Sequence, residues 1–211
     1  MTKPLTFPQL MQWVAESIRD PRGFMRMLKS IEMLRAHQWQ LLIVASIIGV
    51  FVNHISFVMM FDDRVRPASE VERAMFANAL LIIQNPYIHA MLYTSILVIA
   101  CFALFWVARL CGGTGDFGSG ILAIAWISFV TAVLGMVQLA VLNLSAILGD
   151  LLGLAIIVIT LSMMTRFIAE IHGFVSLFQV FVMMIATTLG FMIGFGMILG
   201  ILGITIMGPS V

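Results

Sequence analysis

The stretch that decides the fold is Ile121–Asn143, ILAIAWISFVTAVLGMVQLAVLN, which contains no charged residue over 23 positions. A bilayer core about 30 Å thick needs roughly 20 apolar residues in an α-helix that crosses it. Four further apolar stretches of comparable length lie on either side of it, at Leu41–Phe61, Tyr87–Val107, Ala146–Thr165 and Leu177–Met207. The sequence therefore predicts an all-α, polytopic membrane protein with a bundle of five transmembrane helices.

The composition of the whole chain supports this class. Of its 211 residues, 62% are hydrophobic and only 10% are charged, whereas soluble domains carry about 25% charged residues. We divide the chain into an amphipathic segment, residues 1–38, and a five-span domain, residues 39–211. We expect no cofactor and no nucleic-acid partner.

Basic residues are distributed unevenly along the chain. Residues 1–38 hold six Lys and Arg, and Arg109 and Arg166 follow the second and fourth apolar stretches. The connection between the first and second stretches holds the other three, Arg64, Arg66 and Arg73. With a cytoplasmic amino terminus, eight of the eleven basic residues lie inside, in agreement with the positive-inside rule. We therefore expect the amino terminus inside and the carboxyl terminus outside.

The sequence pattern of residues 7–36 predicts two amphipathic, interfacial helices separated at Asp20-Pro21. Apolar residues recur every three or four positions in both halves, Asp20 suits a helix cap and Pro21 suits the first helical position. Four basic residues lie away from the apolar stripe: Arg19, Arg22, Arg26 and Lys29. Such a segment is typical of one that rests on an anionic cytoplasmic leaflet, where each basic residue adds roughly 1 kcal/mol. A docking face for a cytoplasmic partner is the alternative.

Polar residues inside the spans are functional candidates because they are costly in lipid. The predicted topology places five of them near the outer interface: Asn53, His54, His89, Asn143 and Asp150. We expect these residues to approach one another, with a neutral His54 hydrogen-bonded to Asp150 or Asn143. Interhelical hydrogen bonds, a solute or proton pathway and a metal site are the alternatives. The spacing matches no metal-binding signature, so we expect no metal.

The connection after the second stretch, Arg109–Gly120, contains a GxGxxG pattern by letter. In a dinucleotide-binding fold this pattern follows a strand, but here it lies between two membrane helices. We interpret it as a tight helix–helix connection and expect Arg109 to pair with Asp116.

The connection after the fourth stretch contains Arg166, Glu170 and His172, followed by Gly173. Arg166 and Glu170 are four residues apart and are expected to pair on a helix. Gly173 is suited to ending that helix in a left-handed conformation. For Glu170 and His172, contact with an ion or headgroup and contact with the preceding cytoplasmic connection are the two interpretations.

The fifth apolar stretch contains two GxxxG patterns, formed by Gly190, Gly194, Gly196 and Gly200. Small residues at this spacing let helix backbones approach closely. Packing against a neighbouring span is the first interpretation, and contact with another membrane protein or a second copy is the alternative. The stretch is long enough to be one tilted helix or a helix followed by an interfacial segment.

Three short motifs occur in order along the chain: Asp20-Pro21, Gly112-Gly113-Thr114-Gly115-Asp116-Phe117, and Phe167-Ile168-Ala169-Glu170-Ile171-His172-Gly173-Phe174. In this arrangement the chain resembles the bacterial branch of the Yip family, integral membrane proteins named for interaction with Ypt/Rab GTPases. The resemblance implies five helices, a cytoplasmic amino terminus and a place in the bacterial cytoplasmic (inner) membrane. Eukaryotic members recruit Rab proteins through an Asp-Leu-Tyr-Gly-Pro motif, of which this chain has only Asp20-Pro21. We therefore carry over no GTPase-binding residue.

These patterns favour a non-enzymatic membrane protein that organises partner proteins or lipids. The alternative is a transporter of a small solute, an ion or a lipid that uses the polar residues around His54 and Asp150. The sequence gives no nucleophile with a neighbouring base and no pair of carboxylates expected in one cavity, so we expect no enzymatic activity.

Overall fold

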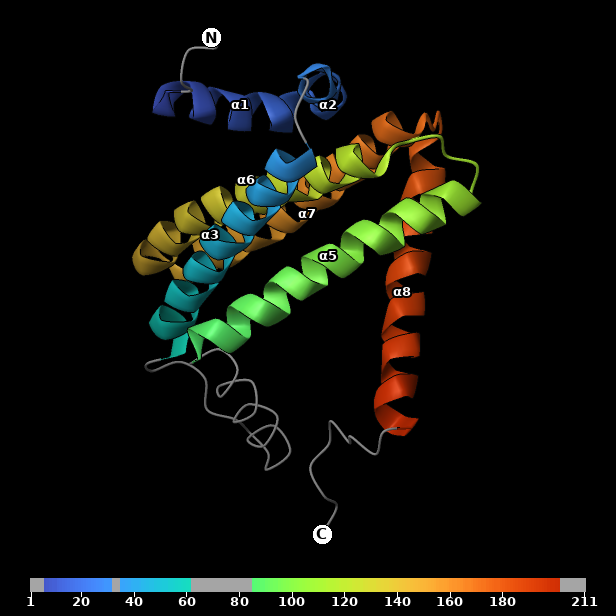
Figure 1. Cartoon of the computed structure of the whole chain (residues 1–211). Helices are drawn as coiled ribbons and strands as arrows, with labels where there is room; N and C mark the ends of the chain where they lie inside the picture. Colours follow the sequence, from blue (N-terminus) through green and yellow to red (C-terminus); the bar gives the residue numbers. More distant parts are fainter. Residues whose placement is uncertain (1–5, 32–34, 62–84, 202–211) are drawn as a thin grey trace.

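The computed structural model describes residues 6–31, 35–61 and 85–201, and this part of the chain is built from helices (Figure 1). The helices are α1 (Phe7–Arg19), α2 (Pro21–Ser30), α3 (Arg35–Phe61), α5 (Pro86–Leu110), α6 (Phe117–Leu144), α7 (Ala146–His172) and α8 (Leu177–Ile201). The connection that carries Arg64, Arg66 and Arg73 lies outside the described residues.

Five of these helices, α3, α5, α6, α7 and α8, are long and apolar enough to cross a membrane. The prediction of an all-α protein with five spans is confirmed. The fifth apolar stretch forms one continuous helix as far as Ile201, and its last six predicted positions, 202–207, lie outside the described residues.

Helix boundaries follow the residues that can satisfy free backbone groups. Asp20 ends α1, and its carboxylate accepts a hydrogen bond from the Gly23 N–H at 3.0 Å to begin α2. Asn85 caps α5, with Pro86 at its first position. Gly173 ends α7 with a φ of 76°, the left-handed conformation predicted for it.

The fourth predicted span is shorter than the helix that forms. Helix α7 continues seven residues beyond Thr165, to His172, so Arg166 and Glu170 lie within its last two turns, on the helix that Gly173 was predicted to end. The reason is local: no glycine or proline interrupts the chain between Gly153 and Gly173, and long charged side chains are compatible with a helix near a membrane surface.

Helix α6 lies at the centre of the bundle and packs against α3, α5 and α7. Its amino-terminal half is the most buried part, because Ile121 and Ala125 pack with Leu42 of α3 and Cys101 of α5. Helix α8 contacts α7 and α5 through Val180 and its neighbours, and then leads away from the other helices (Figure 1).

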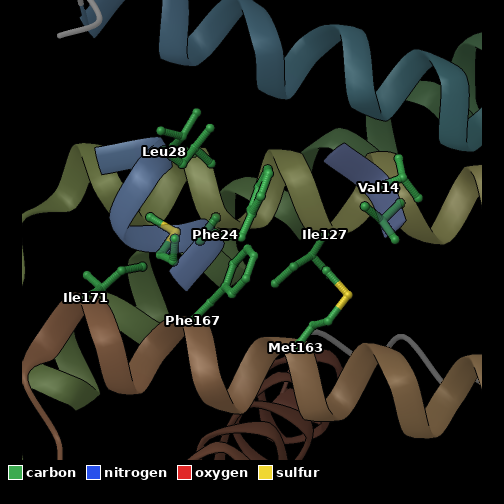
Figure 2. Close-up of a cluster of buried hydrophobic side chains, with 11 residues drawn as sticks. Val14, Phe24, Leu28, Ile127, Met163, Phe167 and Ile171 are labelled. Atoms are coloured by element: carbon green, nitrogen blue, oxygen red, sulfur yellow. The ribbon is translucent and has the colours of Figure 1, made fainter. Parts of the chain in front are cut away.

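Helices α1 and α2, which we call the cap, lie across one end of the bundle (Figure 1). Figure 2 shows Val14 of α1 and Phe24 and Leu28 of α2 among side chains of α6 and α7. Phe24 is 2% exposed and Phe167 of α7 is fully buried. Burying one such side chain stabilises the fold by about 1.5–3 kcal/mol. The apolar stripe expected to rest on lipid is therefore packed against the protein itself.

Three glycines of α8 lie in open space among the described residues. A methyl group added at Gly190, Gly194 or Gly196 would meet no atom within 4 Å. The first interpretation of the GxxxG patterns, packing against a neighbouring span, is therefore wrong for these three residues. The surroundings of Gly200 lie outside the described side chains.

Candidate functional site

The three motifs that lie far apart in the sequence meet at the capped end of the bundle. The Thr114 N–H donates a hydrogen bond to the His172 carbonyl oxygen at 3.1 Å. Arg22 Nη2 donates to the Phe174 carbonyl oxygen at 3.3 Å. We call this region, residues 20–29, 111–117 and 166–174, the junction. It connects the cap, the α5–α6 connection and the end of α7.

The glycines of the α5–α6 connection allow it to lie directly against the end of α7. A Cβ at Gly113 would lie 2.7 Å from His172 Nδ1, and one at Gly115 would lie 2.6 Å from Ile171 Cγ2. Gly112 adopts a φ of 89°, which favours glycine because other residues meet steric strain there. The GxGxxG letters therefore belong to a tight helix–helix connection, as we interpreted them.

Asp116 begins α6 at the junction. Its carboxylate accepts hydrogen bonds from the Ser119 N–H, at 2.9 Å, and from the Ser119 hydroxyl. Partial burial raises the pKa of Asp116, but these hydrogen bonds and the nearby charge of Lys29 outweigh it and hold the pKa below its ordinary value. The carboxylate is thus kept ionised at the amino terminus of a helix, where negative charge is favourable.

Two ion pairs predicted from sequence spacing are not formed. Glu170 Oε1 lies 3.5 Å from Arg26 Nε of α2, so it pairs across the junction and not with Arg166 on its own helix. The guanidinium of Arg109 lies 5.5 Å from the centre of the Phe105 ring and makes a cation–π contact in place of the expected pair with Asp116. Tertiary contacts have displaced the local pairings.

His172 is held inside the junction. Its side chain is buried, and its ring lies 6.1 Å from that of Phe174 and 6.3 Å from that of Phe105, measured between centroids. Its carbonyl oxygen accepts the Thr114 N–H. His172 therefore contacts the α5–α6 connection, as one of the two interpretations predicted. Glu170 does not follow that interpretation, because it contacts Arg26 of the cap.

The four basic residues of the cap have different surroundings. Arg19 and Lys29 are exposed. The Arg26 side chain is 66% exposed although it pairs with Glu170. Arg22 is half-buried and donates a hydrogen bond to the Phe174 carbonyl oxygen. Three of the four cations thus remain open to the surroundings of the capped end.

The polar residues expected to gather at the opposite end do not form one cluster. His54 and His89 are near enough to interact electrostatically. Asn143 Nδ2 donates to the Leu139 carbonyl of its own helix at 2.8 Å, and both Asn53 and Asp150 are exposed. The hydrogen bond predicted between His54 and Asp150 or Asn143 stays a prediction. Depth in the membrane does not determine which way each helix turns its side chains.

An aromatic cluster at the base of the cap was not anticipated. The Phe24 ring lies 4.9 Å from that of Trp126 on α6 and 6.4 Å from that of Phe167 on α7, and Trp13 of α1 lies 6.1 Å from Phe24. Aromatic pairs at such separations add about 0.5–1.5 kcal/mol each beyond burial of their area. The amphipathic pattern showed that Phe24 belongs to an apolar face, but it carried no information about the partner.

Comparison with curated proteins and with solved structures gives no match. The family model described as the Yip1 domain matches residues 15–199. The match begins within α1 and ends within α8, so it includes all three segments of the junction. The chain is therefore a member of the Yip1 domain family of integral membrane proteins.

Proposed function

We propose that this protein is a non-enzymatic membrane-organising protein whose cap presents a basic surface to anionic headgroups of the cytoplasmic leaflet. One observation carries the proposal: the apolar face of the cap is buried against α6 and α7, while Arg19, Arg26 and Lys29 stay exposed. The cap is therefore held on the bundle by packing, and its exposed cations, Arg19, Lys29 and the largely exposed Arg26, can contact lipid. Membership of the Yip1 domain family fits a membrane-associated role.

The orientation follows from charge. With the capped end in the cytoplasm, eight of the eleven basic residues lie on the cytoplasmic side, as the positive-inside rule favours. We propose the inner membrane as its location in a bacterium. The same surface is available to a cytoplasmic protein partner.

The expected strength of the lipid contact is moderate. Each Lys or Arg close to an anionic surface contributes about 1 kcal/mol, so three exposed cations give a preference of about a hundredfold at low ionic strength. The contact weakens as salt rises, because the charges are exposed and are screened within about 10 Å at 0.1 M.

The test uses the full chain in bilayers and spin-labelled lipids that report which headgroups stay beside the protein. The wild type should prefer phosphatidylglycerol to phosphatidylcholine, and the variant Arg19→Gln/Arg26→Gln/Lys29→Gln should lose most of that preference. A matched control, Arg64→Gln/Arg66→Gln/Arg73→Gln, removes three cations from a connection that also holds four acidic residues. Equal loss in both variants would exclude a specific role for the cap.

The transporter alternative receives no support from the geometry of the described residues, because Asn143 bonds to its own helix and Asp150 is exposed. Contact between copies through the open glycines of α8 is compatible with the proposal. In that arrangement Gly190 and Gly194 would let the two helices approach closely.

A further inference from the structure

An open groove of about 400 Å³ lies between α7 and α8 on the outside of the bundle. Its walls are mainly apolar, and several of them are well exposed: Val158, Leu161, Phe178 and Phe181. The groove is within the size range of small-molecule pockets, about 300–1,000 Å³. Since α7 and α8 are both candidate membrane spans, the surface around the groove faces lipid.

One cation, Arg166, lines this groove. It is four residues from Ser162, which also lines the groove, so the two lie on the same face of α7. Arg166 is six residues from the end of the helix, or about 9 Å along its axis. A charged residue within a span is costly in lipid unless it has a partner.

Arg166 is left without an acidic partner. Glu170, the carboxylate expected from the sequence, is paired with Arg26 of the cap. Among the described residues, no carboxylate lies within 4.0 Å of the Arg166 guanidinium. The exposed guanidinium therefore retains its full charge at one end of an apolar groove.

We propose that the α7–α8 groove binds one anionic phospholipid, whose phosphate contacts Arg166 and whose acyl chain lies along Leu161, Val158 and Phe181. An Arg guanidinium matches a phosphate through parallel hydrogen bonds. Val158 lies eight residues farther into the span than Arg166, about 12 Å along the helix, so the apolar wall continues in the direction of an acyl chain. This site is separate from the cap surface and does not require the proposed function.

Native mass spectrometry of the full chain tests the proposal, with equal amounts of phosphatidylglycerol and phosphatidylcholine that carry the same acyl chains. The wild type should retain one phosphatidylglycerol molecule in preference to phosphatidylcholine. Arg166→Gln should lower that retention about tenfold, the loss expected for a hydrogen bond to a charged group. Arg166→Lys should retain part of it. Leu161→Trp, which fills the groove, should lower the retention of both lipids.

Arg35→Gln is the matched control, because it removes an exposed cation at the start of α3 that neither lines the groove nor belongs to the cap. It should bind lipid as the wild type does. Equal retention of the two lipids by the wild type, or unchanged retention by Arg166→Gln, would overturn the proposal. The same loss in Arg35→Gln as in Arg166→Gln would assign the binding to general surface charge. A dimer that protects Phe178 and retains no lipid would assign the groove to a second copy.

Discussion

At the capped end, Arg22, Arg26 and Thr114 each contact a residue near the carboxyl end of α7. At the opposite end, Asn143 bonds to its own helix and Asp150 is exposed. Both ends carry polar residues that the sequence marks as candidates. Those at the capped end bond across helices, whereas the described hydrogen bond of Asn143 stays within α6. The cap accounts for the difference, because it lies against the end of α7 and brings Arg22 and Arg26 within reach of Phe174 and Glu170.

Removing the central aromatic of the cap should have the largest effect. Phe24→Ala leaves a cavity among Trp13, Trp126 and Phe167 and should lower the free energy of unfolding by about 3–5 kcal/mol. Phe51 is 60% exposed, so Phe51→Ala is the control and should cost much less. Thermal unfolding in detergent measures both. Equal losses would contradict the view that the cap is part of the packed core.

Filling the space between the glycine connection and α7 should have the next largest effect. Gly113→Ala and Gly115→Ala place a methyl group against His172 and Ile171 and should each cost about 1–3 kcal/mol of unfolding free energy. Gly190→Ala in α8 meets open space and should be neutral or slightly stabilising, since alanine favours helix. The comparison of unfolding temperatures fails if Gly190→Ala is the most damaging of the three.

Removing the cap residue of α6 should have a smaller effect. Asp116→Ala should cost about 0.5–2 kcal/mol, the usual range for loss of a helix amino-terminal cap. Because folding lowers the pKa of Asp116 below its ordinary value of 3.8, its contribution is complete above that pH and is lost as pH falls through the lowered pKa. The free energy of unfolding is measured for the wild type and for Asp116→Asn between pH 6 and pH 2, at intervals of about one unit. The two values should become equal at the acid end of this range. A constant difference across that range would contradict this assignment.

Substitutions at the opposite end should have the smallest effect. Asp150→Asn and Asn143→Ala change exposed side chains and should alter the free energy of unfolding by less than about 0.5 kcal/mol. Unfolding in the same detergent measures this change. A loss as large as that of Gly113→Ala would mean that the outer polar residues are coupled as the capped-end residues are.

The features predictable from sequence are those set by local chemistry. The spans follow from runs of apolar residues such as Ile121–Asn143, the break at Asp20-Pro21 follows from capping, and the end of α7 follows from the conformational freedom of Gly173. Each depends on residues within a few positions of one another.

The features that could not be predicted depend on contacts between distant segments. The Arg166–Glu170 spacing indicated a pair, but Arg26 of α2 reaches Glu170 instead. The apolar stripe of the cap was compatible with lipid and with protein, and only the packing of Phe24 against Trp126 and Phe167 distinguishes them. The polar residues at the opposite end were grouped by depth, which does not define the rotation of each helix.

Cross-linking in native membranes tests most directly whether the cap is docked on α7. In a chain with Cys101→Ala and Cys111→Ser, the pair Arg26→Cys/Glu170→Cys replaces two residues whose side chains approach to 3.5 Å. A short bismaleimide should cross-link this pair when the cap is packed as in the wild type. The yield of cross-linked product should be much lower when Phe24→Ala is added. The pair Arg19→Cys/Asp150→Cys, at opposite ends of the bundle, should not react. If the first pair cross-links no better than the second, the cap is not docked on α7 and the account is wrong.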